Sequence, residues 1–199
     1  MFRTSYLKTR VKLSKKSGGL WFGLAWLIGA ALVTQVQGAA DHVEIDSEQS
    51  FINVEVHVPL QNFRSHLASY NAAVGLGGDG NISDVALTFR FSDLHSGNGV
   101  RDAHMMAWLG GVEATGAFIL ESLTSAADGT EHALGLLEIH GVKQPVKFPV
   151  VVERHGRDYT ISGEVHFDYR QWELPLLSRV GERVDPQLTV RFKLAGTAQ

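Results

Sequence analysis

The feature that most constrains the fold is the segment 135–150, which reads GLLEIHGVKQPVKFPV. Every second residue is apolar on both sides of a turn at 141–145: Leu137 and Ile139 before it, and Val146, Phe148 and Val150 after it. A repeat of two is typical of a strand with one apolar face and one wetter face. The segment therefore predicts a hairpin of two antiparallel strands.

Six further segments have strand character, most of them with the same alternation: 50–58, 67–76, 82–91, 112–123, 159–167 and 188–194. Together with the hairpin they predict an all-β chain of eight short strands. Short links between sequential strands favour an antiparallel meander, and closure into a barrel removes exposed edges. We therefore predict a single eight-stranded antiparallel β-barrel, although a two-sheet sandwich also fits the alternation.

The alternation breaks between residues 93 and 109. Residues 93–99 are rich in loop formers, and 100–109 (VRDAHMMAWL) show no repeat of two. Asp102 stands early in this segment, and Gly110 and Gly111 follow it, which is typical of a short helix and its end. We predict a short helix or turn near 101–109.

The first forty residues are typical of a targeting segment. A basic stretch precedes an apolar core of fourteen residues at 20–33, and small residues follow at 38–40. This order predicts a signal peptide over 1–40, cleaved near 38–40, and a mature domain over 41–199. An uncleaved anchor is the alternative, but fourteen residues are short against the ~20 that span a bilayer. We expect export, and no insertion into the membrane after cleavage.

Charge and cysteine content exclude several classes of function. All 21 acidic residues but only 12 of the basic ones lie in 39–199, which gives 12 − 21 = −9 for that part of the chain. Such a domain repels phosphate backbones, so we expect no nucleic-acid partner. The chain has no cysteine, which excludes disulfides, thiolate zinc ligands and a thiol nucleophile.

The interior of an eight-stranded barrel either fills with side chains or holds one small ligand. Several residues on the faces expected to point inward are small: Ala72, Ala86, Ala114, Gly116, Gly135 and Gly163. These residues could leave a channel, or they could only taper a solid core. Both alternatives stay open at this point.

Five segments together carry a family resemblance. They are the hairpin at 135–150, EIDSEQSFINV at 44–54, RDAHM at 101–105, DYR at 168–170 and VGERV at 180–184. In this order they resemble the signature segments of the YceI-like family, the periplasmic polyisoprenoid-binding proteins. The hairpin and the RDAHM segment are the more specific of the five.

The resemblance implies a lipocalin-like barrel whose apolar interior holds a long isoprenoid chain. That chain would belong to a polyprenyl phosphate or an isoprenoid quinone, carried in the periplasm without catalysis and without a covalent cofactor. The residues expected to line the lipid are Val85, Leu87, Phe89, Phe118, Leu137, Ile139, Val146, Phe148, Val150, Ile161, Val165, Phe167, Val190 and Phe192.

Four residues are candidates for the mouth of the barrel, where a polar head group would lie: Arg101, His104, Trp108 and Arg170. A guanidinium group matches the oxygens of a phosphate. The alternative roles are structural. Arg101 could pair with Asp102 to pin a loop, Trp108 could belong to the core, and Arg170 could hold the irregular connection that follows it.

Other functions have weaker support in the sequence. A filled barrel could instead serve as a redox-associated or protein-interaction module of the envelope, and a homodimer stays open. The nine histidines include no HxH or HxxxH pair, so we expect no metal site and no metal-dependent hydrolase. No GxSxG motif is present, and we expect no catalytic residue.

Overall fold

A computed structural model describes residues 41–199, apart from 59–61, 128, 177 and 180–181. The predicted signal peptide lies outside the described residues, as do Val180 and Gly181 of the VGERV segment. None of the helices in the described part is long and apolar enough to cross a membrane.

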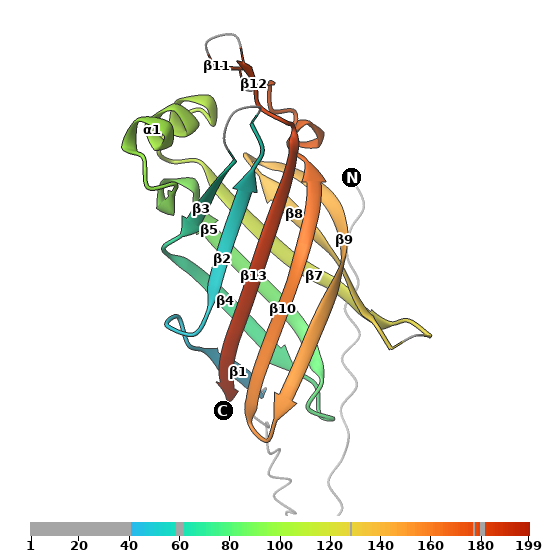
Figure 1. Cartoon of the computed structure of the whole chain (residues 1–199). Coiled ribbons are helices and arrows are strands. Elements are labelled where there is room, and N and C mark those ends of the chain that lie inside the picture. Colours follow the sequence, from blue (N-terminus) through green and yellow to red (C-terminus); the bar gives the residue numbers. More distant parts are fainter. Residues whose placement is uncertain (1–40, 59–61, 128, 177, 180–181) are drawn as a thin grey trace, which may run out of the picture. The chain divides into compact units, whose positions relative to one another are not determined.

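Eight antiparallel strands form a closed barrel (Figure 1). Around the barrel they are β1 (His42–Ile45), β4 (Tyr70–Leu76), β5 (Ile82–Arg90), β7 (Thr115–Ser125), β8 (Glu131–Ile139), β9 (Val142–His155), β10 (Asp158–Asp168) and β13 (Gln187–Ala198). The ring closes where β1 pairs with β13, with Val43 opposite Ala198. The prediction of an eight-stranded antiparallel barrel is confirmed, and the sandwich alternative is wrong.

The edge of β13 is shared by two consecutive strands. Its last residues pair with β1, and its residues 188–193 pair with β2 (Phe51–Val56). Between the two strands, the buried Ser50 hydroxyl accepts a hydrogen bond from the Ala195 amide (2.9 Å) and donates to the Asp46 carbonyl (2.6 Å). From β2 the sheet continues into β3 (Phe63–Leu67) and β6 (Leu94–His95).

The remaining elements are short. They are the 3-10 helices η1 (Phe91–Asp93) and η2 (Tyr169–Trp172), the helix α1 (Gly99–Trp108), and a two-stranded ladder of β11 (Ser178–Arg179) with β12 (Glu182–Arg183). The helix predicted near 101–109 is confirmed. It begins at Gly99 because the Asn98 side chain accepts hydrogen bonds from the amides of Val100 and Arg101, both at 3.1 Å.

The end of the barrel that carries the β4–β5 turn, called the closed end below, is filled with side chains. Val43, Val74 and Tyr159 are almost fully buried there. The Tyr159 hydroxyl donates to the Gly80 carbonyl in that turn at 2.7 Å. Gly80 has a φ of +75°, a backbone conformation that glycine adopts without strain, so the turn favours glycine.

At the opposite end, called the open end, the wall splits between β9 and β10. β9 pairs with β10 only over 150–155, so residues 142–149 pair with β8 alone. Pro145 and Pro149 lie in this stretch, where a missing N–H breaks no ladder. Helix η2 fills the split: the Trp172 indole N–H donates to the Leu137 carbonyl at 2.8 Å, and Trp172 is 1% exposed.

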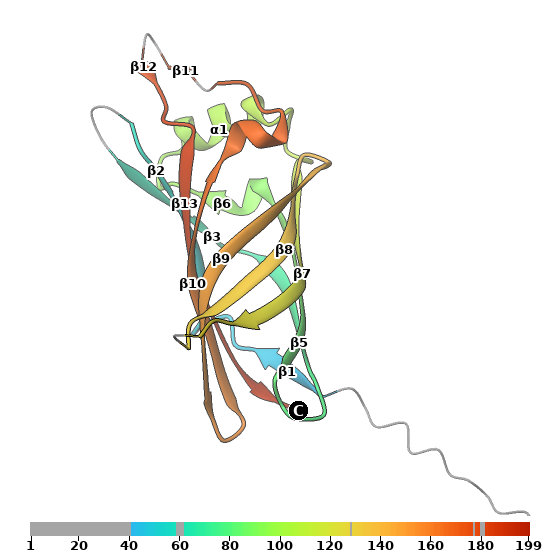
Figure 2. The same cartoon turned by 90° about the vertical axis from the view of Figure 1, so that its right-hand side faces the viewer.

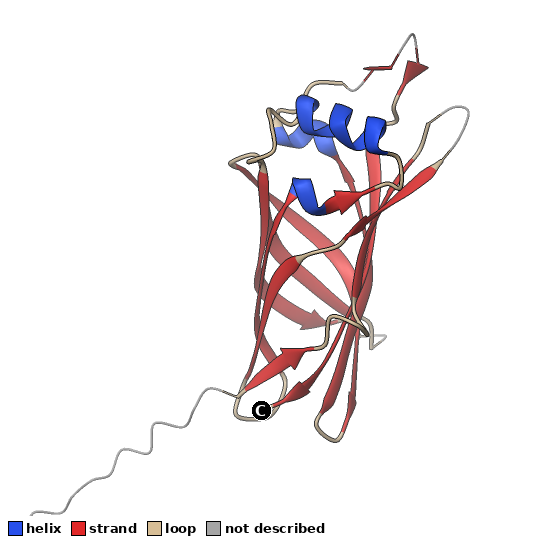
Figure 3. Cartoon of the chain, turned by 90° about the vertical axis from the view of Figure 1, so that its left-hand side faces the viewer, coloured by secondary structure: helices blue, strands red, loops and turns tan. Residues whose placement is uncertain are grey.

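Helix α1 lies across the open end of the barrel (Figures 2 and 3). β6 pairs with the edge strand β3 and ends only four residues before the helix begins, which places the helix at this end. The Trp108 indole N–H donates to the Pro175 carbonyl at 3.0 Å, and its ring meets Tyr169 edge to face at 5.1 Å. These contacts tie the helix to the segment that follows η2.

Candidate functional site

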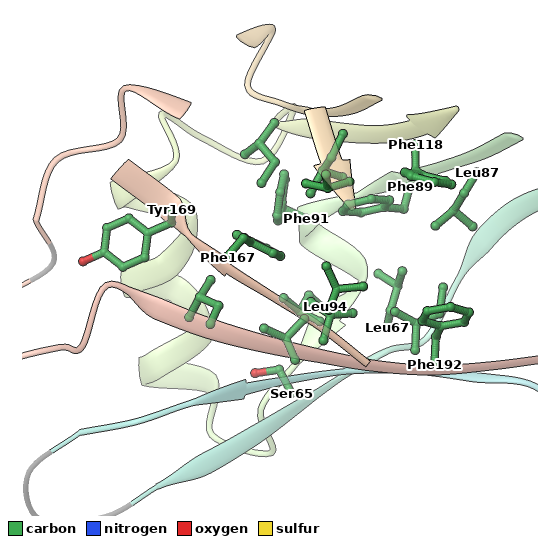
Figure 4. A pocket seen from close by; sticks show the side chains of 18 of the residues that line it. Ser65, Leu67, Leu87, Phe89, Phe91, Leu94, Phe118, Phe167, Tyr169 and Phe192 are labelled. Carbon is green, nitrogen blue, oxygen red and sulfur yellow. The ribbon is translucent and has the colours of Figure 1, made fainter. Parts of the chain in front are cut away.

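The barrel contains a cavity of about 750 Å³, which extends from the filled closed end to α1 (Figure 4). Its volume is within the range of roughly 300–1,000 Å³ that is usual for small-molecule sites. The interior is therefore hollow, which argues against the filled-barrel alternative. All fourteen residues predicted to line a lipid do line this cavity. That they contact a lipid stays a prediction.

Three of the small inward residues make room for aromatic rings. A Cβ atom on Gly116 would lie 2.3 Å from the Phe89 ring, on Gly135 2.5 Å from Phe118, and on Gly163 2.9 Å from Phe192. The glycines therefore do not form a channel; each lets a phenylalanine on the neighbouring strand lie flat along the wall. Ala86 differs from the expectation, because it is exposed on the outer face of β5.

Sequence reasoning missed part of the wall, chiefly on β2 and β3. These lining residues are Ile52, Val54, Val56, Phe63, Ser65 and Leu67. The alternation of the β2 residues was a usable signal. The β3 segment FRSHL had no such signal, since a serine stands at the centre of its inward face.

The polar residues of the lining are concentrated on β3, α1 and the segment between β6 and α1. Ser96 and Asp102 hold each other: the Asp102 carboxylate accepts from the Ser96 amide at 3.0 Å and from its hydroxyl at 2.5 Å. The Arg101 guanidinium lies 4.0 Å from the centre of the Phe63 ring, a cation–π contact. The rest of the wall is almost entirely hydrocarbon.

The four mouth candidates are not equivalent. Arg101, His104 and Trp108 line the cavity from α1. Arg170 is not among the lining residues, because Asp168 holds it on η2: the Arg170 Nε atom donates to both carboxylate oxygens at 2.9 Å. Hydrogen bonding to Arg170 lowers the pKa of Asp168 and raises the pKa of Arg170.

The described residues contain no group of three or more His, Cys, Asp or Glu side chains that could hold a metal ion. The polar or partly polar side chains that line the cavity are Ser65, Ser96, Arg101, Asp102, His104, Trp108 and Tyr169. This set can donate hydrogen bonds to a head group near the open end.

Comparison with known proteins identifies the family. Residues 43–195 match the family described as YceI-like domain. The chain belongs to the YceI-like family. The match spans the strands from β1 to β13, so the family resemblance of the five sequence segments is confirmed. No match was found among curated proteins.

Solved structures share the YceI-like fold at low sequence identity. BcnA from Burkholderia cenocepacia matches with a TM-score of 0.65 at 15% identity, covering 77% of this chain and 100% of that one. A polyisoprenoid binding domain from Saccharophagus degradans, implicated in plant cell wall breakdown, matches with a TM-score of 0.59 at 14% identity, covering 80% and 99%. The Campylobacter jejuni YceI protein matches at 0.54 and 11%, covering 71% and 89%. These similarities establish the fold alone.

Proposed function

We propose that this protein is a non-catalytic carrier of an isoprenoid lipid, whose tail lies in the barrel interior. The observation that carries the proposal is the apolar cavity of about 750 Å³, closed at one end and covered by a helix at the other. Each CH₂ group moved from water into such a wall contributes about 0.8 kcal/mol. Several isoprene units can therefore supply ample affinity without specific polar contacts.

The relatives support the same class of ligand. One solved structure of this fold is a polyisoprenoid binding domain. The signal peptide expected over 1–40 supports a place of action in the periplasm, where a free isoprenoid tail is insoluble and needs a carrier. The candidate ligands are a polyprenyl phosphate and an isoprenoid quinone.

In this proposal the tail enters from the open end, and its head group stays near α1. Arg101, His104 and Trp108 border the cavity there and can contact the head. Arg170 has no part in it, since its guanidinium is engaged by Asp168.

The test is extraction of the purified 41–199 domain with organic solvent, followed by mass spectrometry of the extract. We expect a lipid built of isoprene units in stoichiometric amount. The variant Leu87→Trp should lose it, because Leu87 lines the cavity and the larger ring fills the space of the tail. Thr88→Trp is the matched control, because Thr88 follows Leu87 on β5 and its side chain is exposed on the outer face.

Two results would contradict the proposal. One is an empty extract together with no binding of added isoprenoid quinone or polyprenyl phosphate. The other is equal lipid content in both tryptophan variants, each folded as judged by circular dichroism, because a lipid bound inside the barrel must respond to the inward substitution alone.

A further inference from the structure

A row of polar side chains crosses the outer face of the sheet from β10 to β6. Each member lies directly opposite the next on the neighbouring strand: Glu164, Arg191, Asn53, His66 and His95. The adjacent pair on β3 and β6, Leu67 with Leu94, is buried and lines the cavity. His66 and His95 therefore point outward, where both are exposed. The row ends in two histidines on adjoining strands.

The register places these two imidazoles within reach of a common metal ion. Residues directly opposite each other on antiparallel strands have Cβ atoms about 4.5–5.5 Å apart. An imidazole nitrogen binds a divalent metal at roughly 2 Å, so the two rings can bind one ion between them. Spacing along the chain does not report such a pair, because His66 and His95 belong to separate segments. The absence of an HxH or HxxxH motif therefore does not bear on it.

The side chain of Asn53 orients the ring of His66. Nδ1 of His66 lies 3.2 Å from Oδ1 of Asn53. An amide oxygen only accepts, so Nδ1 of the neutral ring carries the proton and donates it, which leaves a free lone pair on Nε2. A histidine that binds a metal almost always donates its other ring N–H in this way. Asn53 thus prepares His66 as an Nε2 ligand.

The charged neighbours of the pair do not oppose a cation. Glu55 pairs with Arg64 at 2.8 Å and with Arg191 at 2.7 Å, and Arg191 also pairs with Glu164. Two carboxylates therefore balance the two guanidinium groups. Residues 39–199 carry a net charge of −9 (12 basic and 21 acidic residues), which attracts a cation. Since these carboxylates are engaged, water would complete the coordination of an ion at the histidines.

This ligand set favours copper among the first-row metals. Imidazole suits Zn²⁺, Ni²⁺ and Cu²⁺, and at a given site the affinity is highest for Cu²⁺. A tetragonal arrangement of nitrogen and oxygen ligands is typical of Cu²⁺, so two imidazoles and water molecules fit it. A structural zinc site instead uses four protein ligands, and the described residues offer no group of three or more such side chains.

We propose that His66 and His95 bind a first-row divalent metal ion, Cu²⁺ most tightly, on the outside of the barrel, and that the ion fastens β6 to β3. In the described part of the chain β6 is the terminal strand of the sheet, and α1 begins four residues after it (Figure 2). A bound ion would therefore hold α1 over the open end and slow its opening. This second site does not depend on what the cavity holds.

The experiment measures Cu²⁺ binding to the untagged protein by calorimetry, after chelation of other metals with EDTA. The variants His66→Ala and His95→Ala each remove one ligand. His166→Ala is the matched control, because His166 is also exposed on the outer face of this sheet but lies opposite Thr189. Asn53→Leu and Asn53→Asp test the orientation of the His66 ring, since aspartate keeps an acceptor oxygen and leucine does not. Urea unfolding in EDTA reports whether each variant keeps the fold.

We expect one Cu²⁺ ion per chain, bound at least ~10-fold more weakly by each of the two ligand variants and unchanged in the control. Loss of a partner that orients a ligand weakens metal binding about 10- to 100-fold, so Asn53→Leu should weaken it and Asn53→Asp should not. No binding by the unmodified protein would overturn the inference. So would equal affinity in the folded ligand variants, or an equal loss in His166→Ala.

Amide hydrogen exchange over 94–108 tests the effect on α1. Added Cu²⁺ should slow exchange there in the unmodified protein and leave it unchanged in His95→Ala. Unaltered exchange in a protein that binds Cu²⁺ through both histidines would overturn the link between the metal and the helix. All of these results are separate from the lipid extraction, so the failure of one proposal is distinguishable from the failure of the other.

Discussion

The two ends of the barrel are made from the same antiparallel sheet, but they differ in pairing and in filling. At the closed end the wall is also incomplete, because β5 pairs with β7 only over 86–90, but Val43, Val74 and Tyr159 pack into a solid cluster inside it. At the open end β9 parts from β10 over 142–149, and helices take the place of ladder partners. The cavity lies toward the second end. The comparison teaches that a split in the wall does not by itself make a hollow: side chains fill the interior at the closed end, whereas helices cover it at the open end.

The largest effect should come from Trp172→Ala, which removes the ring that fills the split at the open end. Loss of a fully buried tryptophan costs about 3–5 kcal/mol, and the Leu137 carbonyl also loses its donor. Urea unfolding measures the free energy of unfolding. A loss below about 1 kcal/mol, outside the range for a buried ring, would mean that η2 does not hold the split wall together.

A pair of valine substitutions compares the two ends directly. Val74 is 1% exposed in the solid cluster, whereas Val146 is 7% exposed but lines the cavity. Val74→Ala should cost about 2 kcal/mol, because two methyl groups are lost and a void is left. Val146→Ala should cost about 1 kcal/mol or less, because its methyl groups already border a hollow.

The measurement is again the free energy of unfolding, made on protein stripped of lipid so that a bound ligand does not mask the difference. Equal costs for the two valine substitutions would contradict the distinction between a solid and a hollow end.

The third comparison removes one side-chain hydrogen bond from each end. Tyr159→Phe removes the shorter, partly buried bond to the Gly80 carbonyl and leaves only the bond from Arg154 at 3.3 Å, so it should cost about 1 kcal/mol. Trp108→Phe removes the bond to the Pro175 carbonyl, which is exposed to water, so the loss should be about half as large. Thermal unfolding curves give both values, and a reversed order would contradict the expectation that the more buried hydrogen bond contributes more to stability.

The smallest effect concerns acid. Hydrogen bonds from Asn81 lower the pKa of Asp79 at the closed end, and hydrogen bonds from Arg170 lower the pKa of Asp168 at the open end. A lowered pKa in the folded state stabilises the protein above the unfolded value of about 4, and this contribution is lost as the pH falls through the folded value. Both ends should weaken in acid.

The substitutions Asp79→Asn and Asp168→Asn keep an acceptor oxygen but remove the charge. The double variant should melt with a shallower dependence on pH below about 5 than the unmodified protein. An unchanged slope would show that these two carboxylates do not carry the acid sensitivity.

Much of the wall could be predicted from the sequence because the alternation of apolar residues directly reports which side of a strand is buried. The strands β5, β8, β9, β10 and β13 all follow that rule. β3 does not, since Ser65 is inward and Arg64 and His66 are outward, so the segment has little contrast between its faces. Because a serine stands at the centre of its inward face, the sequence did not reveal this strand.

The hollow itself could not be predicted, because it depends on which inward side chains meet across the barrel, and the alternation within one strand does not report this. Gly116, Gly135 and Gly163 had suggested a channel, but cross-strand phenylalanines cover them. Arg170 resembled a mouth residue by its place before a long connection. Its partner, Asp168, is only two residues away in the sequence. That proximity does not reveal that the ion pair holds Arg170 on η2, away from the cavity.

Pro145 and Pro149 bear on how the protein behaves at high concentration. The unpaired stretch of β9 would otherwise offer a free row of amide donors to a strand of another molecule. Two prolines, four residues apart, interrupt that row, so no intermolecular ladder can extend along it. Replacing both with threonine would restore the row, and the variant should then form more β-linked oligomers than the unmodified domain at the same concentration. The gap that admits η2 is thus also protected against misassembly.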